Sequence, residues 1–249
     1  PPVTLNSFQD GLRAVVVGAG GGIGNAIVEL LAESPRVAQV YGLTRTRPVL
    51  ANPRVLSIPF DLRDEASIAA AAARCAADGP LHLVFVATGV LHDRAGLQPE
   101  KSWRALTAPA LAESFAVNAI GPALIGKHFL ERLATREKAV FAALSARVGS
   151  IEDNRLGGWY SYRATKAALH MLMRTFAIEL ARRNPTALCV ALHPGTVDTA
   201  LSGPFQAGVP DGRLFRPRQA AEHLLHVIDG LDPSASGNAF AWDGQRLPF

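Results

Sequence analysis

The sequence predicts an α/β protein with one doubly wound domain over residues 1–249, whose central parallel sheet has about seven strands and helices on both faces. Apolar β-branched runs alternate with Ala- and Leu-rich stretches along the chain, as in βαβ units. The strand-like runs are apolar on both faces, which is typical of strands in the middle of a covered sheet. The length of 249 residues fits one large domain, and 49% hydrophobic against 18% charged residues excludes a disordered chain.

Period and composition place each element along the chain. Short runs of Val, Ile, Leu and Ala predict strands at residues 13–17, 39–44, 55–59, 81–87, 138–144, 187–193 and 238–242. Longer stretches of strong helix formers predict helices at residues 22–32, 64–77, 110–132, 160–183 and 217–228. Residues 88–108 and 196–215 match neither pattern, and each segment follows a predicted strand. Doubly wound sheets bind ligands beyond the carboxyl ends of their strands, so these segments are candidate active-site loops.

Composition also excludes several classes of function. The 25 Lys and Arg and 21 Asp and Glu are scattered along the chain, so the net charge of +4 indicates no nucleic-acid surface. Cys75 and Cys189 lie in apolar stretches and predict no disulfide, and the 7 His show no ligand spacing, so no metal is assigned. No apolar run approaches the ~20 residues of a membrane helix, and residues 1–13 do not resemble a secretory signal. We therefore expect a cytoplasmic protein that does not bind membranes.

The first chemical motif is a run of glycines between the first predicted strand and the first predicted helix. It contains Gly18, Gly22 and Gly24. Glycines at this place allow a tight turn, let the backbone approach a pyrophosphate, and direct the N–H groups of the helix at its charge. No Lys-Ser or Lys-Thr follows, which excludes a mononucleotide P-loop. The motif predicts a Rossmann-type dinucleotide site.

The end of the second predicted strand bears on the choice of cofactor. An NAD site usually has an acidic residue about 20 residues after the glycine turn, where it binds the ribose hydroxyls. This chain instead has Leu-Thr-Arg-Thr-Arg, with Arg45 at the centre. An acid would repel a ribose 2′-phosphate, whereas Arg45 and a neighbouring hydroxyl would bind it. The sequence therefore favours NADP(H) over NAD(H).

The third motif is Tyr162-x-x-x-Lys166 near the start of a predicted helix. Residues four apart share a helix face. A tyrosine hydroxyl has a pKa near 10, and an adjacent ammonium lowers that pKa because it favours the phenolate. The pair predicts a group that can give and take a proton at neutral pH.

With these motifs, nearly the whole chain resembles the short-chain dehydrogenase/reductase family. Its glycine turn is similar to the family's Thr-Gly-x-x-x-Gly-x-Gly, with Val17 in place of Thr, and Tyr162 and Lys166 match the Tyr-x-x-x-Lys signature. Residues 149–151 and 157–163 look most like the C-factor and sniffer-type carbonyl reductase group. The cofactor contacts that the resemblance and the motifs imply are Gly18, Gly22, Ile23, Gly24, Arg45, Asp61, Leu62, Thr88, Gly89, Tyr162, Lys166, Pro194, Gly195, Val197 and Thr199.

Two departures from the family pattern lie close to these motifs. After the fourth predicted strand the family has Asn-Asn-Ala-Gly, whereas this chain has Val-Ala-Thr88-Gly89. The amide side chains that brace the sheet and the cofactor loop are thus absent, and we expect Thr88 to take over part of their role. The family serine of Ser-x-x-Gly falls at Ala146, one residue after Ser145. Neighbouring side chains of a strand point to opposite faces, so Ser145 acts only if the strand end is shifted by one residue. Ser150 is a further alternative for the serine that orients the substrate carbonyl. A site that works without a serine hydrogen bond to that carbonyl is another alternative.

The resemblance implies an oxidoreductase that passes a hydride between nicotinamide and a carbonyl or secondary alcohol carbon. The catalytic residues would be Tyr162 as acid and base, Lys166 on the ribose, Asn118 holding a relay water, and Ser145 orienting the substrate oxygen. A substrate loop at about 196–216, with Phe205 and Phe215 as apolar walls, and a homo-oligomer built on the helices at 110–132 and 160–183 are also expected. The alternatives are a cofactor-binding regulatory protein with little turnover, and a lyase or epimerase.

Overall fold

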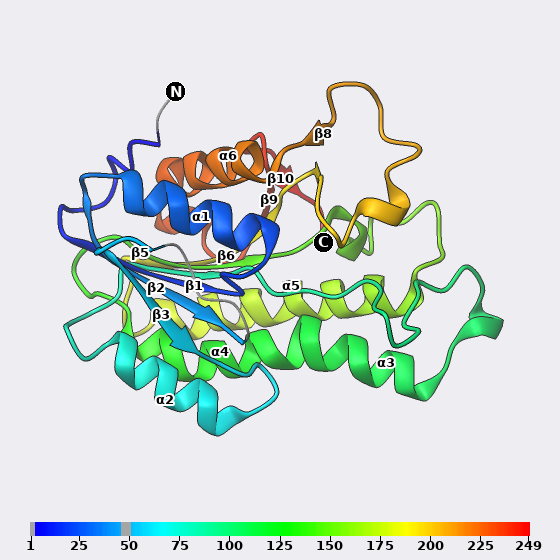
Figure 1. Cartoon of the computed structure of the whole chain (residues 1–249), viewed down its shortest axis with the longest axis horizontal. Coiled ribbons are helices and arrows are strands. Elements are labelled where there is room, and N and C mark those ends of the chain that lie inside the picture. The colour runs from blue at the N-terminus through cyan, green and yellow to red at the C-terminus, as the bar shows by residue number, and fades with distance from the viewer. Residues whose placement is uncertain (1–2, 46–50) are drawn as a thin grey trace.

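The computed structural model describes residues 3–45 and 51–249. It contains a sheet of eight strands in the order β10-β9-β6-β5-β4-β1-β2-β3 (Figure 1). All pairs are parallel except β9 with β10. The strands are β1 (Leu12–Val17), β2 (Val37–Thr44), β3 (Val55–Pro59), β4 (Leu83–Val86), β5 (Ala139–Leu144), β6 (Ala187–His193), β9 (Ala239–Ala241) and β10 (Arg246–Leu247). The predicted doubly wound fold class is confirmed, and β10 is an eighth strand that the sequence did not indicate because its two residues carry no periodic signal.

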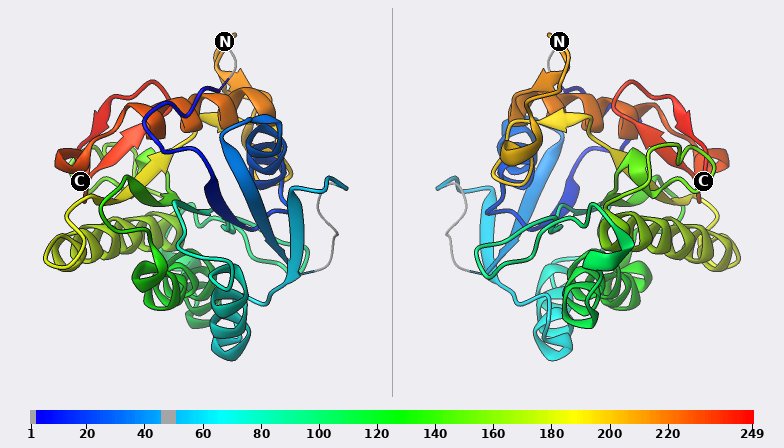
Figure 2. Two further views of the ribbon diagram at one scale, coloured as in Figure 1. Left: turned by 90° about the vertical axis from the view of Figure 1, so that its left-hand side faces the viewer. Right: turned by 90° about the vertical axis from the view of Figure 1, so that its right-hand side faces the viewer.

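Helices cover both faces of this sheet (Figure 2). Helices α1 and α6 pack together on one face, and α2, α4 and α5 cover the other (Figure 1). The helices are α1 (Gly22–Glu33), α2 (Glu65–Cys75), α3 (Ala108–Phe115), α4 (Gly121–Phe129), α5 (Tyr160–Ala181) and α6 (Pro217–Gly230). Short 3₁₀ turns lie at Trp103–Ala105, Leu130–Arg132, Arg147–Gly149, Gly203–Phe205 and Pro233–Ala235.

Strand β1 shows why the central strands are apolar throughout. Val15 and Val17 pack into the cluster beneath α2, α4 and α5. Ala14 and Val16 point the other way, into the cluster beneath α1 and α6. Successive side chains of a strand alternate between faces, so a strand covered on both sides needs apolar residues at every position.

The predicted helix at 110–132 is interrupted in the structure. A π-helical segment, Ala116–Ile120, joins α3 to α4, and Asn118 lies in it, fully buried. Single π turns of this kind are frequent at functional sites, and hydrophobic periodicity alone does not distinguish them from an α-helix.

The combined helix Ala108–Arg132 is also long and apolar enough, by length and composition, to cross a membrane. Its α3 and α4 segments contact α2 and α5 within the fold. A core helix meets the same criterion, so this feature is weak evidence for a membrane span.

The expected substrate loop has structure at both of its ends. Strands β7 (Thr196–Val197) and β8 (Leu214–Phe215) pair in parallel to form a separate two-stranded sheet. Residues between them project from the domain near the carboxyl ends of the main strands (Figure 1). This pairing fixes the base of the loop.

Candidate active site

The glycine turn after β1 is too closely packed for larger residues. Gly18 has φ +83°, which favours glycine, and a Cβ on Gly24 would lie 2.3 Å from the Gly18 carbonyl oxygen. A Cβ on Gly22 would lie 2.9 Å from Cγ2 of Thr199. Helix α1 begins with Gly21 as N-cap and has no side-chain hydrogen bond there. Its first N–H groups are therefore left to bind an anion such as a pyrophosphate.

Two adjoining hollows form one crevice along the carboxyl ends of β1, β2, β4, β5 and β6. The first, about 500 Å³, contains Arg45 and Asp61, and the second, about 270 Å³, contains Tyr162 and Lys166. They meet at Gly21, Ala87, Thr88 and Gly89. The crevice spans the junction of β4 and β1, where the strand order reverses and where doubly wound folds bind their ligands.

Most predicted cofactor contacts line this crevice. They are Gly18, Gly22, Ile23, Gly24, Arg45, Asp61, Leu62, Thr88, Gly89, Tyr162, Lys166, Pro194 and Thr199. Thr88 Oγ1 is buried there and has no hydrogen-bond partner within the described part of the chain. A buried hydroxyl without a partner fits a site built for a polar ligand, and with the glycine turn it fits a dinucleotide.

Gly195 and Val197 do not line the crevice. Val197 packs against Phe215 in the small sheet, and a Cβ on Gly195 would lie 2.8 Å from the Phe215 ring. Phe215 itself is buried against Trp242, with ring centroids 4.7 Å apart. The expectation that Phe215 forms a wall of the substrate loop is therefore wrong, because its ring anchors the base of the loop instead.

Tyr162 and Lys166 lie on one face of α5 and both reach the second hollow. Lys166 Nζ donates a hydrogen bond to the Leu144 carbonyl oxygen at 2.9 Å and lies 5.6 Å from the centre of the Tyr162 ring. Burial raises the pKa of Tyr162 to about 12 and lowers the pKa of Lys166 to about 8. The pKa of Tyr162 thus moves opposite to the expectation, because burial of the phenol disfavours its charged form.

Asn118 uses its side chain to brace the loop after β4. Its Oδ1 accepts a hydrogen bond from Val90 N at 2.8 Å. Its Nδ2 donates to the Val90 carbonyl oxygen at 2.8 Å and to Thr165 Oγ1 at 3.3 Å. These contacts tie Val90 to Thr165 of α5, and the role of Asn118 in holding a relay water stays a prediction.

Ser145 lines the second hollow, and Ala146 does not. Ser145 is buried, and its Oγ lies 2.7 Å from His170 Nε2. The strand end thus presents Ser145 on the side of Tyr162. Ser150 is buried elsewhere, where its Oγ accepts a hydrogen bond from Asp153 N.

Trp159, Phe205 and His92 form an aromatic cluster beside Tyr162; the sequence predicts Phe205 as a wall of the substrate loop and does not assign His92 to the site. Trp159, in a left-handed conformation with φ 52°, lies 6.2 Å from the Tyr162 ring and 5.1 Å from the Phe205 ring. His92 lies 5.7 Å from Phe205, and its Nε2 is 3.0 Å from the Ala200 carbonyl oxygen. Sequence spacing gives no signal for His92, because it lies 108 residues from Ala200 along the chain.

Arg63 is a further residue that sequence reasoning missed. It lines the first hollow and pairs with Glu113 of α3. Thr46, the hydroxyl that follows Arg45, lies outside the described residues. The prediction that this strand end binds a ribose 2′-phosphate is therefore considered for Arg45 alone, which lines the first hollow.

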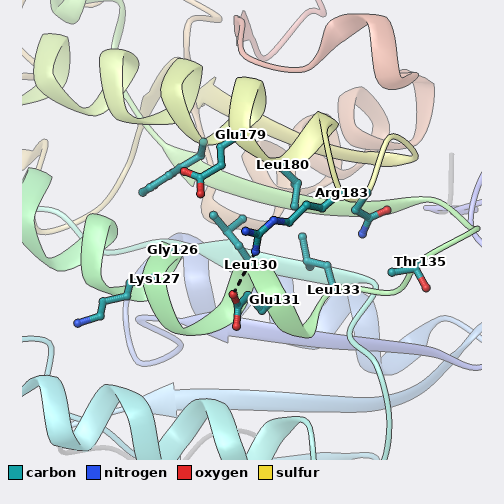
Figure 3. A pocket seen from close by; sticks show the side chains of 11 residues that line it. Gly126, Lys127, Leu130, Glu131, Leu133, Thr135, Glu179, Leu180 and Arg183 are labelled. Atoms are coloured by element: carbon teal, nitrogen blue, oxygen red, sulfur yellow. Dashed lines mark ion pairs between the residues drawn. The ribbon is translucent and has the colours of Figure 1, made fainter.

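A separate groove of about 540 Å³ lies between the carboxyl-terminal halves of α4 and α5 (Figure 3). The ion pair of Glu131 and Arg183 spans it at 3.8 Å. Leu133, in the wall of the groove, forms an isolated parallel β-bridge with Leu81, which lies just before β4. The groove therefore lies toward the amino ends of the strands. None of the predicted site residues lines this groove, since those that line the crevice lie at the carboxyl ends of the strands.

Together, the fold and the crevice define a dinucleotide-binding oxidoreductase. Residues 13–209 match the short chain dehydrogenase family, and the chain belongs to that family. Its predicted resemblance to this family is thereby confirmed, as is its identification as an oxidoreductase acting on alcohol or carbonyl groups.

Individual relatives agree with the C-factor and carbonyl reductase resemblance. The C-signal of Myxococcus xanthus is 36% identical over 139 residues, or 56% of this chain and 78% of that protein. A 1-hydroxy-2-glutathionyl-2-methyl-3-butene dehydrogenase of Rhodococcus sp. (strain AD45) is 31% identical over 237 residues, or 94% and 98%. The crystal structure of NADPH bound carbonyl reductase from chicken fatty liver superposes with a TM-score of 0.81 at 26% identity and covers 97% of this chain and 100% of that one.

Proposed function

We propose that this protein is an NADP(H)-dependent oxidoreductase that passes a hydride between the nicotinamide ring and a carbonyl or secondary alcohol carbon. The observation that carries the proposal is the convergence of Tyr162, Lys166 and Ser145 in a hollow that adjoins the glycine turn. A proton donor, a cation and a hydroxyl meet there, at the end of the crevice away from Arg45. This is the set of groups needed to polarise and protonate a carbonyl oxygen.

Each side chain has a role that follows from its chemistry. The cofactor, when bound, supplies or accepts the hydride at its nicotinamide ring. Tyr162 donates its hydroxyl proton to the substrate oxygen during reduction and takes it back during oxidation. Lys166 holds positive charge beside the phenol, and Ser145 donates a hydrogen bond to the same oxygen. Trp159 and Phe205 offer the substrate an apolar, aromatic wall, which favours a neutral substrate.

Arg45 is proposed to bind the ribose 2′-phosphate. It follows β2 and lines the first hollow with Asp61 and Leu62, two of the predicted cofactor contacts. A guanidinium matches a phosphate group in shape and charge. The carbonyl reductase from chicken fatty liver is likewise NADPH bound.

A paired titration tests the cofactor preference. We expect NADPH to bind more tightly than NADH, and Arg45→Ala to weaken NADPH binding about tenfold while leaving NADH binding nearly unchanged. Arg246→Ala is the matched control, because Arg246 lies in β10 at the opposite edge of the sheet. Equal affinities for the two cofactors, or no change in Arg45→Ala, would contradict this assignment.

Turnover by the same sample tests the reaction. Oxidation of bound NADPH with a panel of aldehydes, ketones and quinones supports the proposal. The alternative is a cofactor-binding regulatory protein, favoured by the likeness to a C-signal. It predicts tight NADPH binding with no turnover of any carbonyl in the panel.

The pH dependence of reduction follows from the two shifted groups. Reduction needs the Tyr162 hydroxyl and the Lys166 ammonium. Because burial sets the pKa of Tyr162 to about 12 and that of Lys166 to about 8, both groups are protonated at neutral pH. We expect kcat/KM for reduction, measured at saturating NADPH, to stay level up to about pH 7 and to fall as pH rises through about 8. A profile that stays flat to about pH 10 would show that the Lys166 charge is not required.

A homo-oligomer built on the long helices stays a prediction. Ile120 next to α4, and Met171 and Ile178 on α5, are exposed apolar side chains on these helices. Their exposure is in keeping with an interface at this face. The cytoplasmic location also stays a prediction.

A further inference from the structure

Ser145 contacts a histidine that has no part in the reaction proposed above. His170 lies on α5, one turn after Lys166 and two turns after Tyr162, on the same helix face. Its Nε2 is 2.7 Å from Ser145 Oγ, and both side chains are buried. We propose that His170 is a positioning residue that turns the Ser145 hydroxyl into a hydrogen-bond donor toward the substrate oxygen; this inference rests on the proposed function.

The hydrogen-bond partners of His170 determine its tautomer. A neutral imidazole carries one N–H and one bare nitrogen. His170 Nδ1 is buried and has no partner among residues 3–45 and 51–249. Buried N–H groups without a partner are rarer than unsatisfied acceptors, so the proton belongs on Nε2 and the bare nitrogen is Nδ1. Burial and the nearby Lys166 ammonium lower the pKa of His170 to about 4, which keeps the ring neutral at physiological pH.

This tautomer fixes the direction of the serine proton. A hydroxyl has one proton to donate and two lone pairs that accept. With His170 Nε2–H donating to Ser145 Oγ, the serine keeps its own proton for an acceptor in the second hollow, where Tyr162 also lies. In the opposite tautomer, Ser145 would donate to the ring and would offer the substrate oxygen only lone pairs.

The surroundings of His170 hold the ring in place. Gly149 leaves the necessary room, because a Cβ there would lie 3.1 Å from His170 Cε1. The Phe249 ring packs against the imidazole at 5.6 Å between centroids. The backbone of Ser145 is fixed as well, since its N–H donates to the Leu192 carbonyl oxygen at 2.8 Å. A fixed donor and a fixed serine explain how a serine one residue before the family position can serve the site.

A double-mutant cycle tests whether His170 acts through Ser145. We expect His170→Leu to lower kcat for carbonyl reduction about tenfold and His170→Gln, which keeps an N–H donor, to restore most of it. Ser145→Ala should lower kcat by at least as much as His170→Leu does. The kcat of the double variant should be no lower than that of Ser145→Ala alone. The NADPH dissociation constant should stay within about twofold of the wild-type value in all four variants. His226→Leu is the control, because His226 is exposed on α6. Additive losses in the double variant would overturn the inference.

A second readout does not depend on activity. In protein with ¹⁵N-labelled histidine, NMR should show His170 neutral, with its proton on Nε2, from about pH 6 to 9. The Ser145→Ala substitution should change the ¹⁵N chemical shifts of the His170 ring. A proton on Nδ1 would overturn the inference even if the enzyme reduces carbonyls. A wild type with the expected tautomer but no turnover would overturn the proposed function and leave this hydrogen bond in place.

Discussion

Replacing Tyr162 with phenylalanine is expected to lower the rate of carbonyl reduction about a thousandfold and to leave NADPH affinity within about twofold of the wild type. The substitution removes one hydroxyl and keeps the ring that packs beside Trp159 and Lys166. The hydroxyl is the only group in our proposal that gives a proton to the substrate oxygen. Its loss therefore affects the chemical step and not the binding of the cofactor.

Tyr160→Phe is the matched control for this experiment. Tyr160 begins α5 two residues before Tyr162 and does not line the crevice. We expect its kcat and its NADPH affinity to equal those of the wild type. Steady-state kinetics and a fluorescence titration on the same preparations measure both quantities. If Tyr162→Phe retains wild-type turnover, the assignment of Tyr162 as the acid is wrong.

Local patterns in the sequence account for most of the fold and for the parts of the site that lie close together in the chain. The apolar strands are covered on both faces as predicted, and the fold class is confirmed. Gly18 and Gly24 lie in one strand–turn–helix unit, and Tyr162 and Lys166 lie one turn apart on one helix. For such pairs, secondary structure alone sets the geometry.

Other features of the site depend on contacts between distant segments. Ser145 Oγ contacts His170, which is 25 residues away from it in sequence. The raised pKa of Tyr162 comes from burial, which spacing does not report. The π turn that holds Asn118 has the same hydrophobic pattern as a helix. Tertiary packing decides each of these, so no local pattern could predict them.

A comparison of two glycine-to-alanine substitutions tests the close packing of the turn that forms the cofactor site. Both Gly24 and Gly230 lie in α-helices, where alanine is favoured over glycine by about 1 kcal/mol. A Cβ on Gly230 would meet nothing within 4 Å, whereas a Cβ on Gly24 would lie 2.3 Å from the Gly18 carbonyl oxygen. The atom that it meets is backbone, so no side chain can rotate away, and α1 must move off the turn.

We therefore expect changes of opposite sign in the free energy of unfolding. Gly230→Ala should raise it by about 0.5–1 kcal/mol. Gly24→Ala should lower it by about 3 kcal/mol, since overpacking outweighs the gain in helix propensity. The same displacement moves the first N–H groups of α1, so Gly24→Ala should also weaken NADPH binding more than tenfold, while Gly230→Ala leaves it unchanged. Urea unfolding and an NADPH titration of the two variants measure these effects. A Gly24→Ala protein as stable as Gly230→Ala would show that the turn has room for a side chain and that its glycines are not there to bring the backbone close to the cofactor.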